Sequence, residues 1–320
     1  MKQHSFERRH RMQWQQLEAT LENPKAPLDQ HFPEQFRQLC HQLSLAKHRR
    51  YSPQLVDRLN EIVIKAHHRF YQHKYRLHFQ WLTFFVHDFP HTVRRNRNFV
   101  LSASALFLLP LLATAITCFI NPEFIYSIAS YEQVKSMEAM YDPSNRVIGR
   151  ERESDTNLYM FGYYIYNNIG ISFRTFAGGV LFGLGTVFFL VFNGLFIGAV
   201  GGHLTQMGFG STFYPFIAGH GAFELTAIAL AGAAGLKLGY AMVHPGQKPW
   251  IAALREAGRD AVLIIYGTTA MLLIAAFIEA FWSSSNAVGP SVKYLVGIGF
   301  WLLVISYLAF SGRRYGSRSY

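Results

Sequence analysis

The run "FVLSASALFLLPLLATAITCFI" (99–120) decides the fold class, because none of its 22 residues carries a charge. A helix of that length rises about 33 Å, enough to cross the roughly 30 Å hydrocarbon core of a bilayer. Half of the 320 residues are apolar, and they are concentrated after about residue 98. The sequence therefore predicts a membrane protein rather than a water-soluble enzyme.

Upstream of this run the chain is polar. Residues 1–78 carry apolar side chains at three- and four-residue spacings among many basic ones, which predicts a small basic helical domain in the cytoplasm. Residues 79–98 mix aromatic side chains with His and Arg, a pattern typical of an interfacial elbow helix. The first residues are polar throughout, so we expect no cleaved signal peptide. Neither Cys40 nor Cys118 is placed for a disulfide.

Charge assigns the two sides of the membrane. The segment 121–157 is acidic, as expected of an extracytoplasmic loop, and the turn-forming and charged residues of 141–157 predict a mobile part. Basic clusters beside apolar spans, such as the tail 312–320, contribute to the net charge of +11. They are typical of cytoplasmic flanks. We therefore expect a bacterial cytoplasmic (inner) membrane protein with both termini in the cytoplasm and no nucleic-acid partner.

The number of spans in the predicted transmembrane domain, residues 99–311, is open. With residue 157 outside and residue 244 inside, an odd number of crossings lies between them, and three would give six spans in all. The stretch "GGHLTQMGFGSTFYPFIAGHG" (201–221) is rich in Gly and weakly apolar, so broken half-helices can replace one crossing and leave five. The predicted fold is all-α. It is a polytopic helical membrane protein with five or six transmembrane helices, a broken or re-entrant segment and the small N-terminal domain.

Polar side chains within the apolar region are the candidate functional residues. An unpaired charge there costs roughly 3 kcal/mol or more, so each should face a protein interior, a wet cavity or an interface. We predict one intramembrane polar cluster, made of Asn167, Asn168, Arg174, Asn193, His203, His220 and Glu224.

His220 and Glu224 are four positions apart and share a helix face, so the carboxylate can orient and charge-stabilise the imidazole. Three interpretations stay open: a structural hydrogen bond at a packing site, a proton or ion relay in a transport path, and a metal or hydrolytic site. The spacing is not that of HExxH, and no third or fourth ligand lies within a turn or two. We expect no metal, no cofactor and no catalytic residue.

Glycines spaced four apart form a second pattern in the apolar region. Such spacing stacks small residues on one helix face, which predicts close helix packing and is compatible with a homodimer. The alternative is that they permit bends or substrate passage, as in the broken helices of transporters. The residues are Gly179, Gly183, Gly194, Gly198, Gly202, Gly235 and Gly239.

Other chemical signatures do not occur in the sequence. It has no GxxxxGK[ST] phosphate loop, no GxSxG nucleophile elbow and no GxGxxG motif. The 14 histidines are mostly scattered through the basic N-terminal region without ligand spacing. Only the pairs His67/His68 and His87/His91 are close enough to test as metal ligands.

Four sequence elements follow one another in a specific order: Asn167-Asn168, "AGGVLFGLGT" (177–186), "FNGLFIGAVGGHL" (192–204) and "GHGAFELTAIALAGAAGLKLGYAMVHPG" (219–246). In this order they resemble the core of the stage II sporulation protein M family. The resemblance extends over about residues 80–311 and includes the "FVHDFPHTVRRN" approach to the first span. One departure is Gly219, where the family usually has proline. Without that fixed kink, the helix start at His220 is expected to be set differently.

The resemblance implies a multi-pass protein of the cytoplasmic membrane, similar to a scaffold that anchors envelope-associated partners. Relatives outside spore formers often neighbour a MoxR-type ATPase, so we expect membrane lipid and cytoplasmic ATPase-type or envelope proteins as partners, docking on the basic N-terminal domain. Three hypotheses follow: a non-enzymatic scaffold, a permease or channel for a small solute, lipid or ion that uses the Asn/His/Glu cluster, and an intramembrane enzyme. We favour the scaffold.

Overall fold

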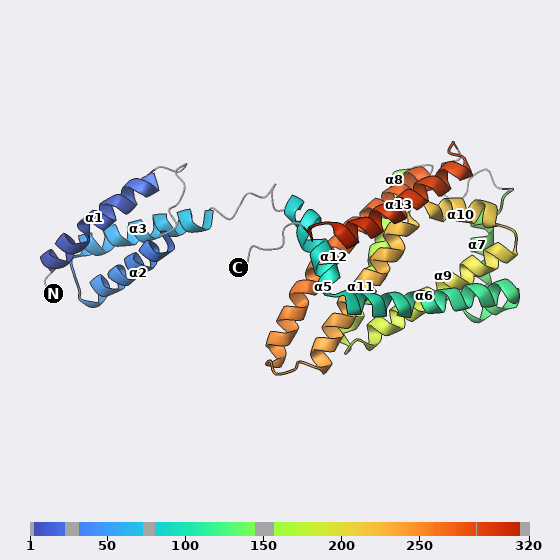
Figure 1. The fold of residues 1–320 in the computed structure, drawn as a ribbon, viewed down its shortest axis with the longest axis horizontal. Coiled ribbons are helices and arrows are strands. Elements are labelled where there is room, and N and C mark those ends of the chain that lie inside the picture. Colours follow the sequence, from blue (N-terminus) through green and yellow to red (C-terminus); the bar gives the residue numbers. More distant parts are fainter. Residues whose placement is uncertain (1–2, 23–31, 73–80, 145–156, 286, 314–320) are drawn as a thin grey trace. The chain divides into compact units, whose positions relative to one another are not determined.

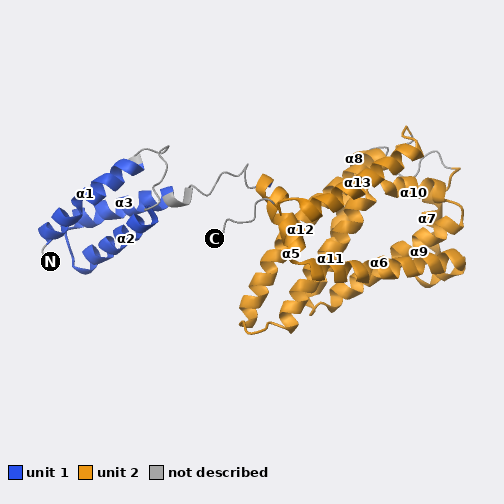
Figure 2. Cartoon of the chain, in the orientation of Figure 1, with its two compact units in different colours: residues 1–81 blue, residues 82–320 orange. Residues whose placement is uncertain are grey.

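The computed structural model describes residues 3–22, 32–72, 81–144, 157–285 and 287–313. The chain forms two compact units, unit 1 over Met1–Trp81 and unit 2 over Leu82–Tyr320 (Figure 2). All regular secondary structure in the described residues is helical, which confirms the predicted all-α fold.

Unit 1 contains α1 (Gln3–Glu22), α2 (Phe32–His48) and α3 (Pro53–Gln72) (Figure 1). Helices α1 and α2 each pack on α3, and their apolar faces close one core. The largest side chains in that core are Phe6, Trp14, Phe32, Leu39 and Leu59. The helical domain predicted for 1–78 corresponds to these helices, and residues 73–78 lie outside the described part of the chain.

Unit 2 is a helical bundle. In chain order its elements are the π-helix η1 (Phe84–Asp88), α5 (Phe89–Arg95), α6 (Arg97–Ile120), the 3-10 helix η2 (Pro122–Ser127), α7 (Tyr131–Tyr141), α8 (Asn157–Ala177), the 3-10 helix η3 (Gly178–Val180), α9 (Leu184–Gln206), α10 (Gly210–Ala218), α11 (Gly221–Val243), α12 (Trp250–Ile278), the π-helix η4 (Glu279–Ser283) and α13 (Pro290–Phe310). Five helices in the described residues are long and apolar enough to cross a membrane: α6, α9, α11, α12 with η4, and α13. The chain is a polytopic membrane protein.

Helices α8 and α10 explain why the sequence left the span count open. Helix α8 has 21 residues, long enough for a crossing, but the polar Asn167, Asn168 and Arg174 lower its apolar character. Helix α10 has nine residues, or about 14 Å of helix, too short to cross. The broken element predicted within 201–221 is therefore α10, with breaks on both sides.

The bundle has two ends that the contacts define. At the α5 end, Arg95 pairs with Asp260 near the start of α12, and Arg94 Nη1 donates to the Leu308 carbonyl of α13 at 2.8 Å. At the α7 end, His203 near the end of α9 lies 2.9 Å from a carboxylate oxygen of Glu138 on α7. The α5 end thus brings together the start of α6, the part of α12 around Asp260, and the end of α13.

Glycines allow α6 and α9 to approach closely along most of their length. A Cβ atom on Gly194, Gly198 or Gly202 would overlap, in that order, the carbonyl oxygens of Phe107, Leu111 and Ala115 on α6. The three glycines of α9 and the three carbonyls of α6 are each spaced four residues apart, so the same contact repeats at every turn along the two helices. Only hydrogen fits at these three positions of α9.

The remaining predicted packing glycines meet where η3 touches α11. A Cβ on Gly179 would overlap the Gly235 carbonyl, and one on Gly239 would overlap the backbone of Gly183. Gly183 itself has φ 84°, a left-handed conformation at the start of α9 that a larger residue rarely adopts. The chain can therefore reverse between α8 and α9 directly against α11.

The elbow predicted for 79–98 corresponds to η1 and α5, which Asn96 separates from α6 with a non-helical backbone. The Phe89 ring is buried against Gly267 of α12, where a Cβ would overlap it. Tyr307 donates its hydroxyl to the Phe85 carbonyl at 2.5 Å, and Ser311 to that of Val86 at 2.7 Å. The elbow is thereby fixed to α12 and α13.

The segment after α6 contains η2 and α7 rather than loop alone. A capping box at Ser130 and Gln133 starts α7. Of the stretch 141–157 that the sequence predicts to be mobile, residues 145–156 lie outside the described part, as do 314–320 of the basic tail.

Candidate functional site

Three ionisable side chains meet at the α7 end of the bundle. His220 directly precedes α11, Glu224 lies in its first turn, and Glu279 begins η4 at the end of α12. One potential metal-ligating atom from each lies within 4.8 Å of the other two. No other group of three His, Cys, Asp or Glu residues comes this close in the part of the chain that the structure describes.

The break between α10 and α11 places His220. A side chain at Gly219 would overlap the Trp282 ring, and the preceding Ala218 carbonyl lies where a Cβ on Gly297 of α13 would be. Glycine is therefore required at 219 for the ring of Trp282 to pack there. This contact gives a physical reason for the departure from the family's usual proline.

The π-helical turn η4 brings a second residue of α12 toward the histidine. His220 Nδ1 lies 3.1 Å from Ser283 Oγ, and Lys293 Nζ of α13 donates to the Ser283 carbonyl at 2.7 Å. His220, Ser283 and Lys293 are all buried. Single π-turns in α-helices are frequently found at functional sites.

The carboxylate of Glu279 is incompletely satisfied. Its side chain is only 9% exposed, and its Oε2 atom has no hydrogen-bond partner. Asn168 of α8 approaches this carboxylate, yet the Asn168 Nδ2 atom is also buried without a completed hydrogen bond. Buried polar atoms without partners are rare in native proteins, because each costs about 1–3 kcal/mol or more.

The structure brings together only some of the residues predicted as one cluster. Asn168, which approaches Glu279, accepts at its Oδ1 from Asn167 Nδ2 at 3.0 Å. Arg174 is exposed and bonds the Gly170 carbonyl of its own helix. Asn193 bonds the Phe189 carbonyl of its own helix, and His203 pairs with Glu138. Arg174 and Asn193 thus make contacts within their own helices, whereas His203 joins α9 to α7.

Sequence reasoning missed Glu279, although a local signal was present. It is the only charged residue in the apolar run 261–281, where a lone acid marks a functional candidate. Lys293 and Ser283 carried weaker signals because they border a polar turn. The contacts that join all three to His220 depend on how α11, α12 and α13 pack.

A second buried polar group lies at the α5 end and was also missed. Asp260 on α12 is paired with Lys237 of α11 and Arg95 of the elbow, and accepts from Asn96 Nδ2 at 3.1 Å. Lys237 Nζ also donates to Asn96 Oδ1 at 2.7 Å. Asp260 thus has two cationic partners and a hydrogen bond, in contrast to Glu279, and joins three elements structurally.

The two members of each histidine pair lie close together, but in the described residues neither pair forms part of a group of three potential metal ligands. The rings of His87 and His91 stack with centroids 5.5 Å apart, and His87 Nδ1 contacts Asp88 at 2.9 Å. His67 and His68 form an edge contact at 6.2 Å. Neither pair belongs to the one three-residue group with ligand geometry.

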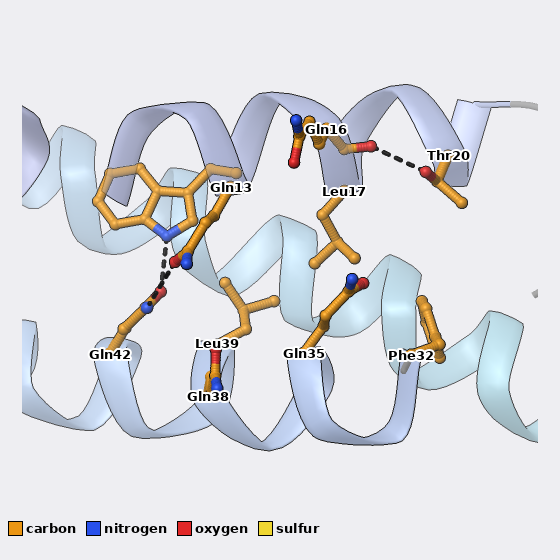
Figure 3. A pocket seen from close by; sticks show the side chains of 10 residues that line it. Gln13, Gln16, Leu17, Thr20, Phe32, Gln35, Gln38, Leu39 and Gln42 are labelled. Atoms are coloured by element: carbon orange, nitrogen blue, oxygen red, sulfur yellow. Dashed lines mark hydrogen bonds between the residues drawn. The ribbon is translucent and has the colours of Figure 1, made fainter. Parts of the chain in front are cut away.

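Unit 1 has a groove between α1 and α2, which both pack on α3. Five glutamines line one part of it, together with apolar side chains, in a space of about 350 Å³ (Figure 3): Gln13, Gln16, Gln35, Gln38 and Gln42. Trp14 Nε1 donates to Gln42 Oε1 at 2.7 Å across this groove. The exposed amides offer both donors and acceptors, the chemistry that a peptide backbone requires.

The groove continues into a basic part. Gln13, Gln38 and Gln42 line both parts, and the second adds Arg9, His10, Arg37, His41 and Arg49, with Glu34 as its one acid. A groove so lined attracts an acidic segment by charge as well as by hydrogen bonds.

Comparisons with known proteins agree with this architecture. The profile described as stage II sporulation protein M matches residues 102–284, more than half of the chain. The chain belongs to this family. A second profile, a domain of unknown function (DUF8413), matches residues 4–72, which are the helices of unit 1.

Among curated relatives of this family member, "Uncharacterized protein MJ0793" from Methanocaldococcus jannaschii is 28% identical over 128 residues, covering 38% of this chain and 70% of the relative. No solved structure matches. The family match confirms the resemblance drawn from the Asn-Asn, Asn-Gly and HGxxE elements.

Proposed function

We propose that this member of the stage II sporulation protein M family is a non-enzymatic scaffold of the bacterial cytoplasmic membrane that recruits a protein partner through unit 1. The observation that carries the proposal is the groove of unit 1. It lies in a separately cored helical unit, so a membrane anchor and a polar docking surface are combined in one chain.

The charges at the two ends of the bundle support an orientation with unit 1 in the cytoplasm. The α5 end carries Arg94, Arg95 and Arg97, with Arg255 and Arg259 near the start of α12. The α7 end carries the acidic segment around Glu132. Lys and Arg are enriched in cytoplasmic flanks, and unit 1 precedes the α5 end in the chain.

The lining of the groove supports an acidic extended segment as its ligand. The arginines supply charge for carboxylates, and the glutamines supply paired donors and acceptors for a peptide backbone. By the family resemblance, the partner is a cytoplasmic ATPase-type or envelope protein. The close glycine-mediated packing between α6 and α9 suits a compact anchor, and the same GxxxG spacing is compatible with a homodimer.

Site-specific photo-crosslinking in native membranes tests the proposal. A photoreactive residue at Gln38, in the groove, should capture a defined protein, and Arg9→Glu with Arg37→Glu should abolish the capture because both reverse the groove's charge. The matched control is Arg8→Glu, an exposed residue on the same helix that does not line the groove. Capture that is unchanged by the groove variants, or lost equally with Arg8→Glu, would contradict the proposal.

A permease or channel is the second candidate, favoured by the polar side chains that α8 presents in the bundle. Asn168 and Ser172 are one turn apart, and both carry a buried polar atom without a hydrogen-bond partner. In a transport path such atoms would face water or solute.

Cysteine accessibility separates the two candidates. In a chain with Cys40 and Cys118 replaced by serine, Asn168→Cys should resist a membrane-impermeant maleimide if the bundle is a packed anchor. Tyr166→Cys is the control: this position of the same helix is exposed, so it measures how strongly the maleimide labels the outer surface of α8. Labelling of position 168 from one aqueous side, blocked by a solute, would favour the permease.

A further inference from the structure

The three ligand atoms of His220, Glu224 and Glu279 have the spacing of a coordination sphere. They lie within 4.8 Å of one another. At metal–ligand distances of about 2.0–2.2 Å, two ligands of one ion stand roughly 3.4–4.4 Å apart, depending on the angle. Rotamer adjustments of less than about 1 Å would therefore place all three around a common centre.

An independent observation points to an occupant. Glu279 Oε2 is buried and has no hydrogen-bond partner among the described residues. A carboxylate oxygen of Glu224, which carries the same charge when ionised, lies within 4.8 Å of a carboxylate oxygen of Glu279. A carboxylate oxygen that is buried, unpartnered and next to a second carboxylate requires a cation or a shared proton between them.

The histidine is held in the orientation that a ligand needs. Its Nδ1 lies 3.1 Å from Ser283 Oγ, while its Nε2 lies 3.8 Å from Glu224 Oε2. The second distance is too long for an N–H···O hydrogen bond. With the Nδ1 proton donated to Ser283, the Nε2 lone pair points at the carboxylates, and metal-bound histidines usually donate their other ring N–H in this way.

From these contacts we propose that His220, Glu224 and Glu279 bind one divalent first-row transition-metal ion. A dication balances the two carboxylates, so the site becomes neutral in the low-dielectric bundle. Lys293, the nearby cation, donates to the Ser283 carbonyl and leaves the carboxylates to the ion. Asp260 and Lys237 balance each other at the opposite end.

The donor set selects the class of metal. One imidazole nitrogen and two carboxylate oxygens suit Zn²⁺ or Mn²⁺, whereas Mg²⁺ and Ca²⁺ prefer oxygen ligands alone. Zn²⁺ accepts three protein ligands and a fourth from water. The Asn168 Nδ2 atom is buried without a hydrogen-bond partner, so it has a donor available for such a ligand.

The ion would link the start of α11 to the end of α12. His220 stands at the break between α10 and α11, directly before the first residue of α11. A shared ion would fix that break to η4. The expected role of the ion is structural. The metal proposal does not depend on whether unit 1 recruits a partner.

Metal analysis of the full chain tests the proposal. After purification in detergent and removal of metal with EDTA, the protein should rebind about one equivalent of Zn²⁺, measured by plasma mass spectrometry. Glu279→Gln, which keeps the side-chain shape, should raise the Kd for Zn²⁺ by at least roughly 100-fold. Ser283→Ala, which removes only the contact to Nδ1, should raise it by roughly 10–100-fold.

Glu138→Gln is the matched control, because Glu138 also pairs with a buried histidine but lacks a third ligand. It should keep the full equivalent. Failure of the wild-type chain to bind Zn²⁺ or Mn²⁺, as expected if a shared proton occupies the site, would overturn the proposal. Retention of the ion by Glu279→Gln would do the same. If Glu279→Gln does not fold, Co²⁺ provides a second test. The wild type should show visible d–d absorption with Co²⁺, and Ser283→Ala should lose this absorption when the metal is limiting.

Discussion

Lys237 on α11 is ion-paired with Asp260 on α12, and the same carboxylate also binds Arg95 and Asn96 of the elbow. Asp260 is only 6% exposed. The pair therefore connects two spans and the chain that leads into the first span, at the end opposite to His220.

Replacing Asp260 by alanine should strongly destabilise unit 2. The change leaves the Lys237 ammonium in the bundle without its carboxylate, and breaking a buried pair in this way costs about 3–5 kcal/mol. Unfolding of the full chain in mixed detergent micelles measures the loss. Asp88→Ala is the control, because Asp88 is 45% exposed and its contact with His87 contributes about 1 kcal/mol at most. Equal losses of stability in the two variants would contradict the structural role of the buried Lys237–Asp260 pair.

Alanine at Gly198 should force α6 and α9 apart. The added methyl group overlaps the Leu111 carbonyl oxygen and Thr114 Oγ1, and such overpacking costs about 1–3 kcal/mol. Gly201→Ala lies on the same helix and meets only the Phe213 ring at 3.8 Å, an ordinary contact. The expected result is a lower unfolding midpoint for Gly198→Ala alone. A comparable shift at both positions would show that helix propensity, not contact, is responsible.

Glu138 should make stability depend on pH below its ordinary pKa of 4.5. Burial alone would raise its pKa, but hydrogen bonds from Lys135 and His203 outweigh burial and hold the pKa below its ordinary value of 4.5. The stabilisation is therefore complete above the unfolded pKa and is lost as pH falls through the lower folded pKa. The difference in unfolding midpoint between wild type and Glu138→Gln should shrink across this range. A difference that stays constant would contradict the pairing.

Trp14→Phe should loosen unit 1. Phenylalanine lacks the indole N–H, so the buried Gln42 Oε1 loses its 2.7 Å donor, at a cost of about 1–3 kcal/mol. Hydrogen exchange of the full chain, followed by mass spectrometry, should show faster exchange in α1 and α2 and unchanged exchange in α6. Thr20→Ala removes only a bond within α1 and should leave both unchanged. Faster exchange throughout the chain would argue for a general effect.

The sequence could predict the spans because each long apolar run must satisfy its backbone internally once it lies in lipid. It could not decide on α8, where Asn167, Asn168 and Arg174 reduce the apolar character of a helix that is still long enough to cross. The structure shows that Asn168 faces other helices while Arg174 is exposed, a distinction that depends on packing.

The candidate site was predictable only where its members are close in the chain. His220 and Glu224 are one helical turn apart, so their shared face followed from spacing. Glu279 reaches them through the packing of α11 on α12 and through a π-turn that the apolar pattern of 261–281 does not indicate. The sequence shows no third ligand within a turn or two of His220 and Glu224, and Glu279 lies far beyond that distance in the chain.

Helix α11 is the least apolar of the five spanning candidates and the most enclosed by protein. Eleven of its 23 residues are alanine or glycine, whose small side chains favour close packing against other helices over contact with lipid. During synthesis, α6, α8 and α9 leave the ribosome before it. Stable insertion of α11 should thus depend on a groove that these earlier helices have already assembled. The order of the helices in the sequence would then also set the order in which they insert into the membrane.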